Sequence, residues 1–435
     1  MSPLRATVFS PVVMLALLPG RAEAFCGAFV GDPDDTMSNT SSQVILARDG
    51  TTTTLTVVMD YTGSAEEFAI LLPVPEVLGK DDVQSLDRTL VEWIGAYTTP
   101  RQVVYTCDTV FATSDATPVA GCGLGFGCMS SYDLENAAFK DAADTGVRVE
   151  NSFTEYGYEF VVLSAEESGS LYTWLDNNGF SVPAGGETVL QDYIDSGTYF
   201  LAAKVALSKV EMVDGWLPPI QLSYQSDLFG LPIRIGTISA TGPQDVVIYT
   251  LTSVETGGQV SITNYPELSL PNECTWSGSD FGTFYNEHFA AAHEAQGAGW
   301  VKEYGWDLEP TAAATGYHCD PCTATPAAPT ADGTFGAFGL PSRSAYITRL
   351  HARYSPEQAT TDLVFAESGI LRARDQLKYI DPLPELESLF PDCDAGWAEN
   401  PGSCPVDPEP RDTGLLWLAL GGSLGTALAL RRKRR

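Results

Sequence analysis

The segment QVILARDGTTTTLTVVM, residues 43–59, decides the fold class of this chain. It holds two apolar runs, Val44–Leu46 and Leu55–Met59, on either side of Asp49-Gly50. Asp-Gly is a frequent dipeptide of tight hairpin turns, and runs rich in Val, Ile and Leu on both sides of it are typical of strands. The segment therefore predicts a β-hairpin.

The same kind of pattern continues along the chain, with short helical stretches between the strands. We expect a second hairpin at 147–163 and further strands at 68–72, 199–207, 220–224, 233–239, 246–251, 259–263, 345–354 and 363–365. Apolar residues at helical spacing predict helices over 83–97, 171–175, 189–194 and 281–295. Because strands and helices do not alternate regularly, the predicted class is α+β with a mainly antiparallel sheet and several short helices.

The two ends of the chain predict export. Arg5, an apolar run and then Ala22-Glu23-Ala24 form the pattern of a signal peptide over residues 1–24. At the other end, the uncharged stretch 414–430 would span about 25 Å as a helix, and the cations after it should stay in the cytoplasm. The residues that define this predicted membrane anchor in 414–435 are Leu415, Leu416, Trp417, Leu418, Leu420, Leu430, Arg431, Arg432, Lys433, Arg434 and Arg435.

Between these ends we expect an exported α+β body over residues 25–390, either one domain or two subdomains split near 165–200. An acidic stretch rich in proline, 391–413, follows as a stalk. The predicted location is the cell envelope, with the body outside the cytoplasm. Two fates of the tail stay open: a permanent transmembrane helix, or cleavage by an envelope protease and sorting of the body to the cell surface.

The charge is strongly acidic. The chain has 56 Asp and Glu against 24 Lys and Arg, a net charge of −32. Such a field repels nucleic acid and favours cations or basic partners, although a role in solubility alone would give the same composition.

All nine cysteines follow the predicted signal peptide, and in an oxidising compartment most of them should form disulfides. The Cys319-Asp320-Pro321-Cys322 motif is open to a structural disulfide, a redox pair or half of a zinc site. A structural role is favoured, because the Thr-, Ala- and Pro-rich context offers no strand before the motif. Cys122 and Cys128 would close a glycine-rich turn, and Cys393 and Cys404 would pair locally.

Few residues suggest catalysis or a cofactor. Asp32, Asp34 and Asp35 offer hard oxygen ligands for calcium, but the glycine and distal glutamate of an EF-hand loop are missing. No other cofactor is expected. With four histidines in the chain, and His351 inside a predicted strand, histidine-based catalysis has few candidates.

A series of short motifs adds a resemblance. They occur in the order Phe25-Cys26-Gly27, Leu72-Pro73-Val74-Pro75, Leu231-Pro232-Ile233-Arg234-Ile235-Gly236, Cys319-Asp320-Pro321-Cys322 and Thr348-Arg349-Leu350-His351-Ala352-Arg353-Tyr354. From about residue 25 to about residue 380 the chain resembles the bacterial family known as domain of unknown function 2330. The resemblance implies an exported bacterial protein and supplies no catalytic residues. The tail is similar to the tripartite sorting signals of Gram-negative bacteria.

Taken together, these features predict an envelope protein with a binding or structural role and an unidentified ligand. Two alternatives stay open. One is an extracytoplasmic enzyme, either a carboxylate-type hydrolase or a thiol-disulfide protein that uses Cys319 and Cys322. The other is a calcium-dependent adhesin.

Overall fold

The computed structural model describes residues 27–31, 37–38, 42–59, 61–63, 65–104, 146–183, 185–208, 210, 212, 216–240, 242–270, 281–308, 333–370 and 375–381. These residues fall into two compact units. The first unit contains the described residues up to 100, those of 146–270 and those of 287–377. The second contains 101–104, 281–286 and 378–381.

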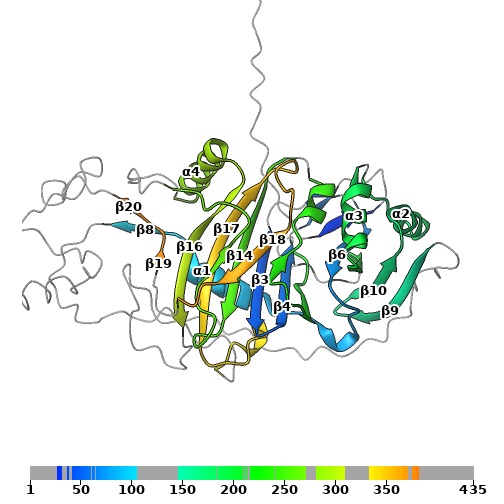
Figure 1. Ribbon diagram of the computed structural model, residues 1–435, viewed down its shortest axis with the longest axis horizontal. Helices are drawn as coiled ribbons and strands as arrows, with labels where there is room; N and C mark the ends of the chain where they lie inside the picture. Colours follow the sequence, from blue (N-terminus) through cyan, green and yellow to red (C-terminus); the bar gives the residue numbers. More distant parts are fainter. Residues whose placement is uncertain are drawn as a thin grey trace, which may run out of the picture. The chain divides into compact units, whose positions relative to one another are not determined.

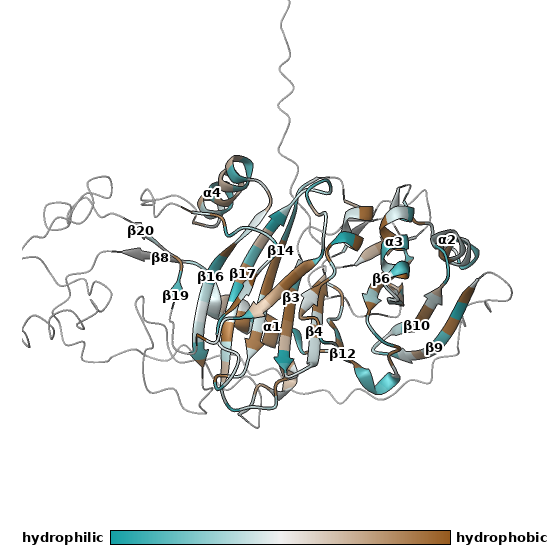
Figure 2. Cartoon of the chain, viewed as in Figure 1, coloured by the Kyte–Doolittle hydropathy of each residue, from teal (hydrophilic) through white to brown (hydrophobic). Residues whose placement is uncertain are grey.

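The predicted first hairpin is confirmed and lies inside an eight-stranded sheet. β3 (Ser42–Asp49) pairs antiparallel with β4 (Thr52–Met59). Gly50 has a φ of 60° in the turn, a conformation that glycine adopts without steric cost. Both faces of β3 are buried, and most of this strand is coloured hydrophobic in Figure 2.

The eight strands are ordered β19-β16-β17-β14-β3-β4-β12-β7. Among these eight strands, only the β14–β3 pair is parallel. β3 and β14 lie side by side in Figure 1 although they are far apart along the chain. The other strands of this sheet are β7 (Val83–Gln84), β12 (Ile220–Gln225), β14 (Gln244–Thr252), β16 (Gly299–Leu308), β17 (Ala345–Tyr354) and β19 (Asp375–Gln376).

A second, fully antiparallel sheet of the same unit has the order β1-β6-β11-β10-β9. Its strands are β1 (Ala28–Val30), β6 (Glu67–Val74), β9 (Val147–Glu155), β10 (Tyr158–Ala165) and β11 (Tyr199–Ala206). β9 and β10 form the predicted second hairpin. β9 alternates between hydrophilic and hydrophobic bands in Figure 2, as expected for a strand with one exposed face.

The buried hydrophobic residues show which layers of this unit pack against each other. Phe68 and Ile70 of β6 share a core with Val57 and Ile248 of the eight-stranded sheet. The other face of the five-stranded sheet is covered by α2 (Ser168–Asn177) and α3 (Gly186–Asp195). The other face of the eight-stranded sheet packs against α1 (Arg88–Thr98), whose Val91 and Ile94 are buried there. Each sheet thus has a helical layer on its outer face.

The remaining described elements are short. In the first unit they are the strand pair β2 (Met37–Ser38) and β5 (Thr62–Gly63), the three-stranded sheet of β13 (Gly230–Leu231), β18 (Leu363–Glu367) and β15 (Val260–Ile262), and the 3-10 turns η1 (Lys80–Asp82), η2 (Arg234–Ile238) and η3 (Gly336–Phe338). In the second unit, β8 (Arg101–Val104) pairs parallel with β20 (Lys378–Asp381). The Tyr379 ring of this unit contacts Phe281, Phe284 and Tyr285, the first residues of α4 (Phe281–Gln296).

The α+β class with mainly antiparallel strands is therefore confirmed, but one predicted strand is wrong. Residues 234–238 form the 3-10 turn η2 and not a strand. Ile233 is buried in the core between the sheets, whereas Ile235 is buried beneath α2 and α3. The Arg234 N–H donates to the carboxylate of Asp362 at 3.0 Å instead of to a neighbouring strand. The isoleucines alternate because the chain passes here from one hydrophobic core to the other, and not because these residues form a strand.

Two boundaries and one missed strand also differ from the prediction. The helix expected from residue 83 begins at Arg88, since Val83 belongs to β7 and Asp87 caps the helix by accepting from Thr89 N–H at 2.9 Å. β6 continues through Pro73, beyond the last residue that pairs with β1, where proline is tolerated. The ten-residue strand β16 was not predicted at all.

Several predictions fall outside the described residues. These are the signal peptide, the stalk, the tail with its membrane anchor, all nine cysteines, and Asp32, Asp34 and Asp35. No helix in the described part of the chain has the length and apolar character needed to cross a membrane. The split into subdomains near 165–200 stays a prediction.

Two glycines with positive φ test how tightly η3 packs on β4. A Cβ on Gly339 (φ 88°) would lie 2.2 Å from Thr54 Oγ1, whereas a Cβ on Gly50 would meet no atom within 4 Å. Gly50→Ala should cost about 1–2 kcal/mol of unfolding free energy from backbone strain alone. Gly339→Ala should cost clearly more in a denaturant titration, because the clash adds to the same strain. Equal losses would contradict the close approach.

Candidate ligand-binding site

Three cations alternate along one face of β17. Arg349, His351 and Arg353 occupy every second position, while Leu350 and Ala352 between them point into the core shared by the two sheets. This follows from the two-residue period of a strand. The cations therefore lie on the face of the eight-stranded sheet that carries α1.

A β-bulge in β16 supplies the opposite charge. The register against β17 shifts between Lys302 and Tyr304, which makes Glu303 the extra, bulged residue of β16. Bulges of this kind redirect side chains and are common beside functional sites. The Glu303 side chain is fully buried and lies between Arg349 and His351.

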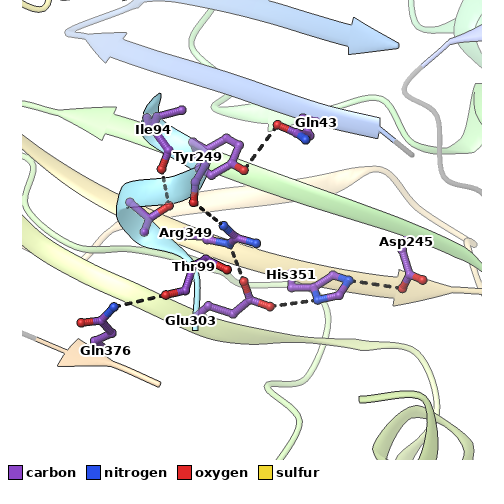
Figure 3. Close-up of polar contacts among 11 residues, drawn as sticks. Gln43, Ile94, Thr99, Asp245, Tyr249, Glu303, Arg349, His351 and Gln376 are labelled. Carbon is purple, nitrogen blue, oxygen red and sulfur yellow. Dashed lines mark hydrogen bonds and ion pairs between the residues drawn. The ribbon is translucent and has the colours of Figure 1, made fainter. Parts of the chain in front are cut away.

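The resulting ion-pair network consists of Arg349, Glu303, His351, Asp245 and Arg353. Figure 3 shows the first four of these residues. Glu303 Oε1 lies 2.9 Å from His351 Nδ1, and Glu303 Oε2 accepts from Arg349 Nε. On its other side, His351 Nε2 lies 3.4 Å from Asp245 Oδ1. Arg353 donates to both Asp245 oxygens, with an Nε–Oδ1 distance of 2.6 Å.

The histidine at the centre of the network is held in its charged form. Burial would lower the pKa of His351, but Glu303 and Asp245 outweigh it and raise the pKa to about 9. Burial opposes ionisation of Asp245 as well, yet His351 and Arg353 lower its pKa below the usual range. Phe289 of α4 stacks on the His351 ring with a centroid distance of 3.9 Å, which shields this pair from water. Both members of this pair are therefore ionised at neutral pH.

Beside the network, a cavity of about 380 Å³ lies between α1 and the sheet. This volume is in the range of small-molecule sites. Its lining comes from α1 and its C-cap residue, from four strands and from the loop before β12: Gln43, Val58, Arg88, Val91, Glu92, Gly95, Ala96, Thr99, Trp216, Tyr249 and Arg349.

Arg349 belongs to both the network and the cavity. Its Nε is held by Glu303, and its Nη1 donates to the carbonyl of Gly95 in α1 at 3.1 Å. The guanidinium carbon lies 5.4 Å from the centroid of the Tyr249 ring. Tyr249 in turn lies 3.5 Å, hydroxyl to Oε1, from Gln43. These contacts fix an arginine in the wall of the cavity (Figure 3).

A second arginine enters the cavity from the first turn of α1. Arg88 donates from Nε to Glu92 at 3.0 Å, and its guanidinium carbon lies 4.5 Å above the Trp216 ring. Its Nη1 is buried and has no hydrogen-bond partner among the residues that the structure describes.

Little of this site was predicted. The sequence marks His351 only as a histidine in a predicted strand, and Arg349 and Arg353 only as parts of a motif. Glu303 and Asp245 were missed, although the alternation Arg349-x-His351-x-Arg353 inside an apolar strand indicates a buried face that needs carboxylates. The predicted cysteine sites and calcium ligands cannot be placed, because they lie outside the described residues. Within those residues there is no group of three or more His, Cys, Asp or Glu that could hold a metal ion.

Fold and site together define a two-sheet α+β protein with a ligand-sized cavity beside a buried ion-pair network. The chain belongs to a family described as uncharacterised proteins conserved in bacteria (DUF2330), whose model matches residues 20–366. The family resemblance seen in the sequence is thereby confirmed. No curated protein and no solved structure matches the chain.

The charge of His351 makes the stability of the fold depend on pH. A histidine whose folded pKa is raised stabilises the fold fully below its unfolded pKa of about 6.5, and that contribution is lost as the pH rises through about 9. The unfolding free energy should fall by up to roughly 3 kcal/mol over this interval. His351→Gln should remove most of this slope in denaturant titrations between pH 6 and 10.

His293 provides the matched control. It lies 3.1 Å from Gln358 Oε1, and burial lowers its pKa, so its contribution changes below about pH 6.5 and not above it. His293→Gln should therefore keep the alkaline slope. An unchanged slope in His351→Gln would show that the histidine does not carry its charge inside the fold.

Proposed function

We propose that this chain is an exported protein of the bacterial cell envelope that binds a small ligand in the cavity between α1 and the eight-stranded sheet. The observation that carries the proposal is the fixed position of Arg349 in the cavity wall, between Glu303 and the Gly95 carbonyl. Burying a charge costs several kcal/mol unless the charge is paired. The buried Glu303 and the Gly95 carbonyl supply this pairing for Arg349 and hold it in one place. A cavity with one rigid charged group and aromatic walls is typical of ligand sites.

The network favours binding over acid–base catalysis. General acids and bases work best when their pKa lies near the working pH. The pKa of Asp245 is lowered and that of His351 is raised, so both move away from neutrality. These groups are therefore suited to hold Arg349 and not to exchange protons with a substrate.

The cellular setting of the proposal comes from the sequence. The signal-peptide pattern at 1–24 and the apolar, basic-ended tail at 414–435 support an extracytoplasmic body that is anchored in the membrane or sorted to the surface. In that setting the acidic surface would keep the body soluble, and the stalk would hold it away from the membrane.

The site is tested by filling the cavity. Ala96 lines it from the exposed side of α1, so Ala96→Phe should occupy the space of a ligand. Ala291→Phe is the matched control, an exposed alanine within α4. We expect a fragment library screened by saturation-transfer NMR to give a set of binders whose affinity drops at least tenfold in Ala96→Phe and stays unchanged in Ala291→Phe. The same binders in all three proteins, or none in the wild type, would contradict the proposed site.

Export is tested separately by the intact mass of the protein purified from its native envelope. Removal of residues 1–24 and the mass loss of several disulfides are expected. The C-terminal mass would also distinguish an intact tail from a cleaved one. Full-length protein in the cytosol with nine reduced cysteines would refute the proposed location.

A further inference from the structure

Two arginines line the same cavity and differ in their hydrogen bonds. Arg349 is engaged by Glu303 and Gly95, whereas Arg88 has a buried Nη1 that meets no acceptor in the described part of the chain. A buried donor left unpaired costs about 1–3 kcal/mol. Nη1 itself is closed to water, so a ligand in the cavity that Arg88 lines would meet the guanidinium through its other donors.

The surroundings of Arg88 are those of a guanidinium prepared for a planar acceptor. Trp216 lies against it at 4.5 Å, and Glu92 holds its Nε at 3.0 Å, so the direction of the remaining donors is set. A guanidinium of fixed orientation binds a carboxylate through parallel hydrogen bonds. Glu92 is the more exposed member of the pair, with 62% of its side chain accessible against 23% for Arg88, and can swing into water when a ligand replaces it.

The charges around the cavity favour a ligand with a single negative charge. Arg88 and Glu92 cancel each other. The third charged residue of the lining is Arg349. The lining of the cavity therefore holds two guanidinium groups and one carboxylate, in a chain whose net charge is −32.

The rest of the wall is apolar or aromatic. Val58, Val91 and Ala96 supply small apolar surfaces, and Trp216 and Tyr249 supply rings. Such a wall stabilises the hydrophobic body of a ligand, while one or two polar groups set its orientation.

We propose that the ligand of this cavity is a small aromatic or apolar monocarboxylate, and that Arg88 receives its carboxylate with Arg349 close by. This inference rests on the cavity being the binding site and adds the chemical class of the ligand. In it, Glu92 competes with the ligand for Arg88, and Arg349 contributes a second positive charge in a fixed position.

The test uses benzoate as the probe and benzamide as its uncharged counterpart, measured by calorimetry on the full chain. Wild type should bind benzoate more tightly than benzamide. Arg88→Gln should weaken benzoate by about tenfold to one hundredfold, the range for a lost charged hydrogen bond, and leave benzamide unchanged. Glu92→Gln should act in the opposite direction and strengthen benzoate, because it removes the negative charge that competes with the ligand for Arg88.

Arg234→Gln is the matched control. Arg234 has a similar exposed fraction, 22%, and also pairs with one carboxylate, Asp192 at 2.6 Å, but it does not line the cavity. This variant should leave benzoate binding unchanged. If Arg88→Gln fails to fold, the Glu92→Gln result still decides the question, since no gain in benzoate affinity would contradict the competition.

The outcomes separate the two proposals. Equal affinity of wild type for benzoate and benzamide, both lost in Ala96→Phe, would overturn the carboxylate class and keep the site. If wild type binds neither probe, the proposed ligand class is wrong. If Ala96→Phe binds the probes as tightly as wild type does, the ligand class is wrong as well, and the probes bind outside this cavity.

Discussion

The structure on the α1 side of the eight-stranded sheet depends on the burial of Glu303 between Arg349 and His351. A fully buried carboxylate is tolerable only when cations and hydrogen bonds replace the lost water. The bulge in β16 makes this possible, because the extra residue turns its side chain toward two β17 cations at once. Asp245 then balances His351 and Arg353 from the neighbouring strand β14. Removal of Glu303 would take away the carboxylate that both Arg349 and His351 contact.

The same interaction links the sheet to the helix that forms the roof of the cavity. Arg349 reaches from Glu303 to the Gly95 carbonyl, so the position of α1 over the sheet is set partly by the network. Gly95 permits this approach, because a Cβ there would lie 3.2 Å from the Tyr249 hydroxyl. The cavity is therefore a consequence of how the ion pairs hold α1. The charged residues that line the cavity are mainly arginines, whereas the chain as a whole is acidic. This local positive charge would favour anionic ligands.

The parts of the fold that the sequence predicted correctly have strong local patterns. The hairpin of β3 and β4 and that of β9 and β10 each combine apolar runs with a turn of suitable residues. β16 was missed because glycines at 299 and 305 and the charged residues 302 and 303 weaken the pattern of a strand. Residues 234–238 were misassigned because alternation there comes from burial in two different cores. The candidate site was hardly predicted, since its members lie on α1, β14, β16 and β17 and meet only through the sheet.

By itself, the sequence determined the α+β class, the two hairpins, four helices of the described part and the family, because these depend on local periodicity, turn residues and motif order. Only the tertiary structure decided which charges meet. Glu303, Arg349, His351 and Asp245 are brought together by strand order and by one bulge, and neither can be read from spacing along the chain. The cavity depends on the same long-range pairing, because its walls come from segments joined only by the packing of α1 on the sheet.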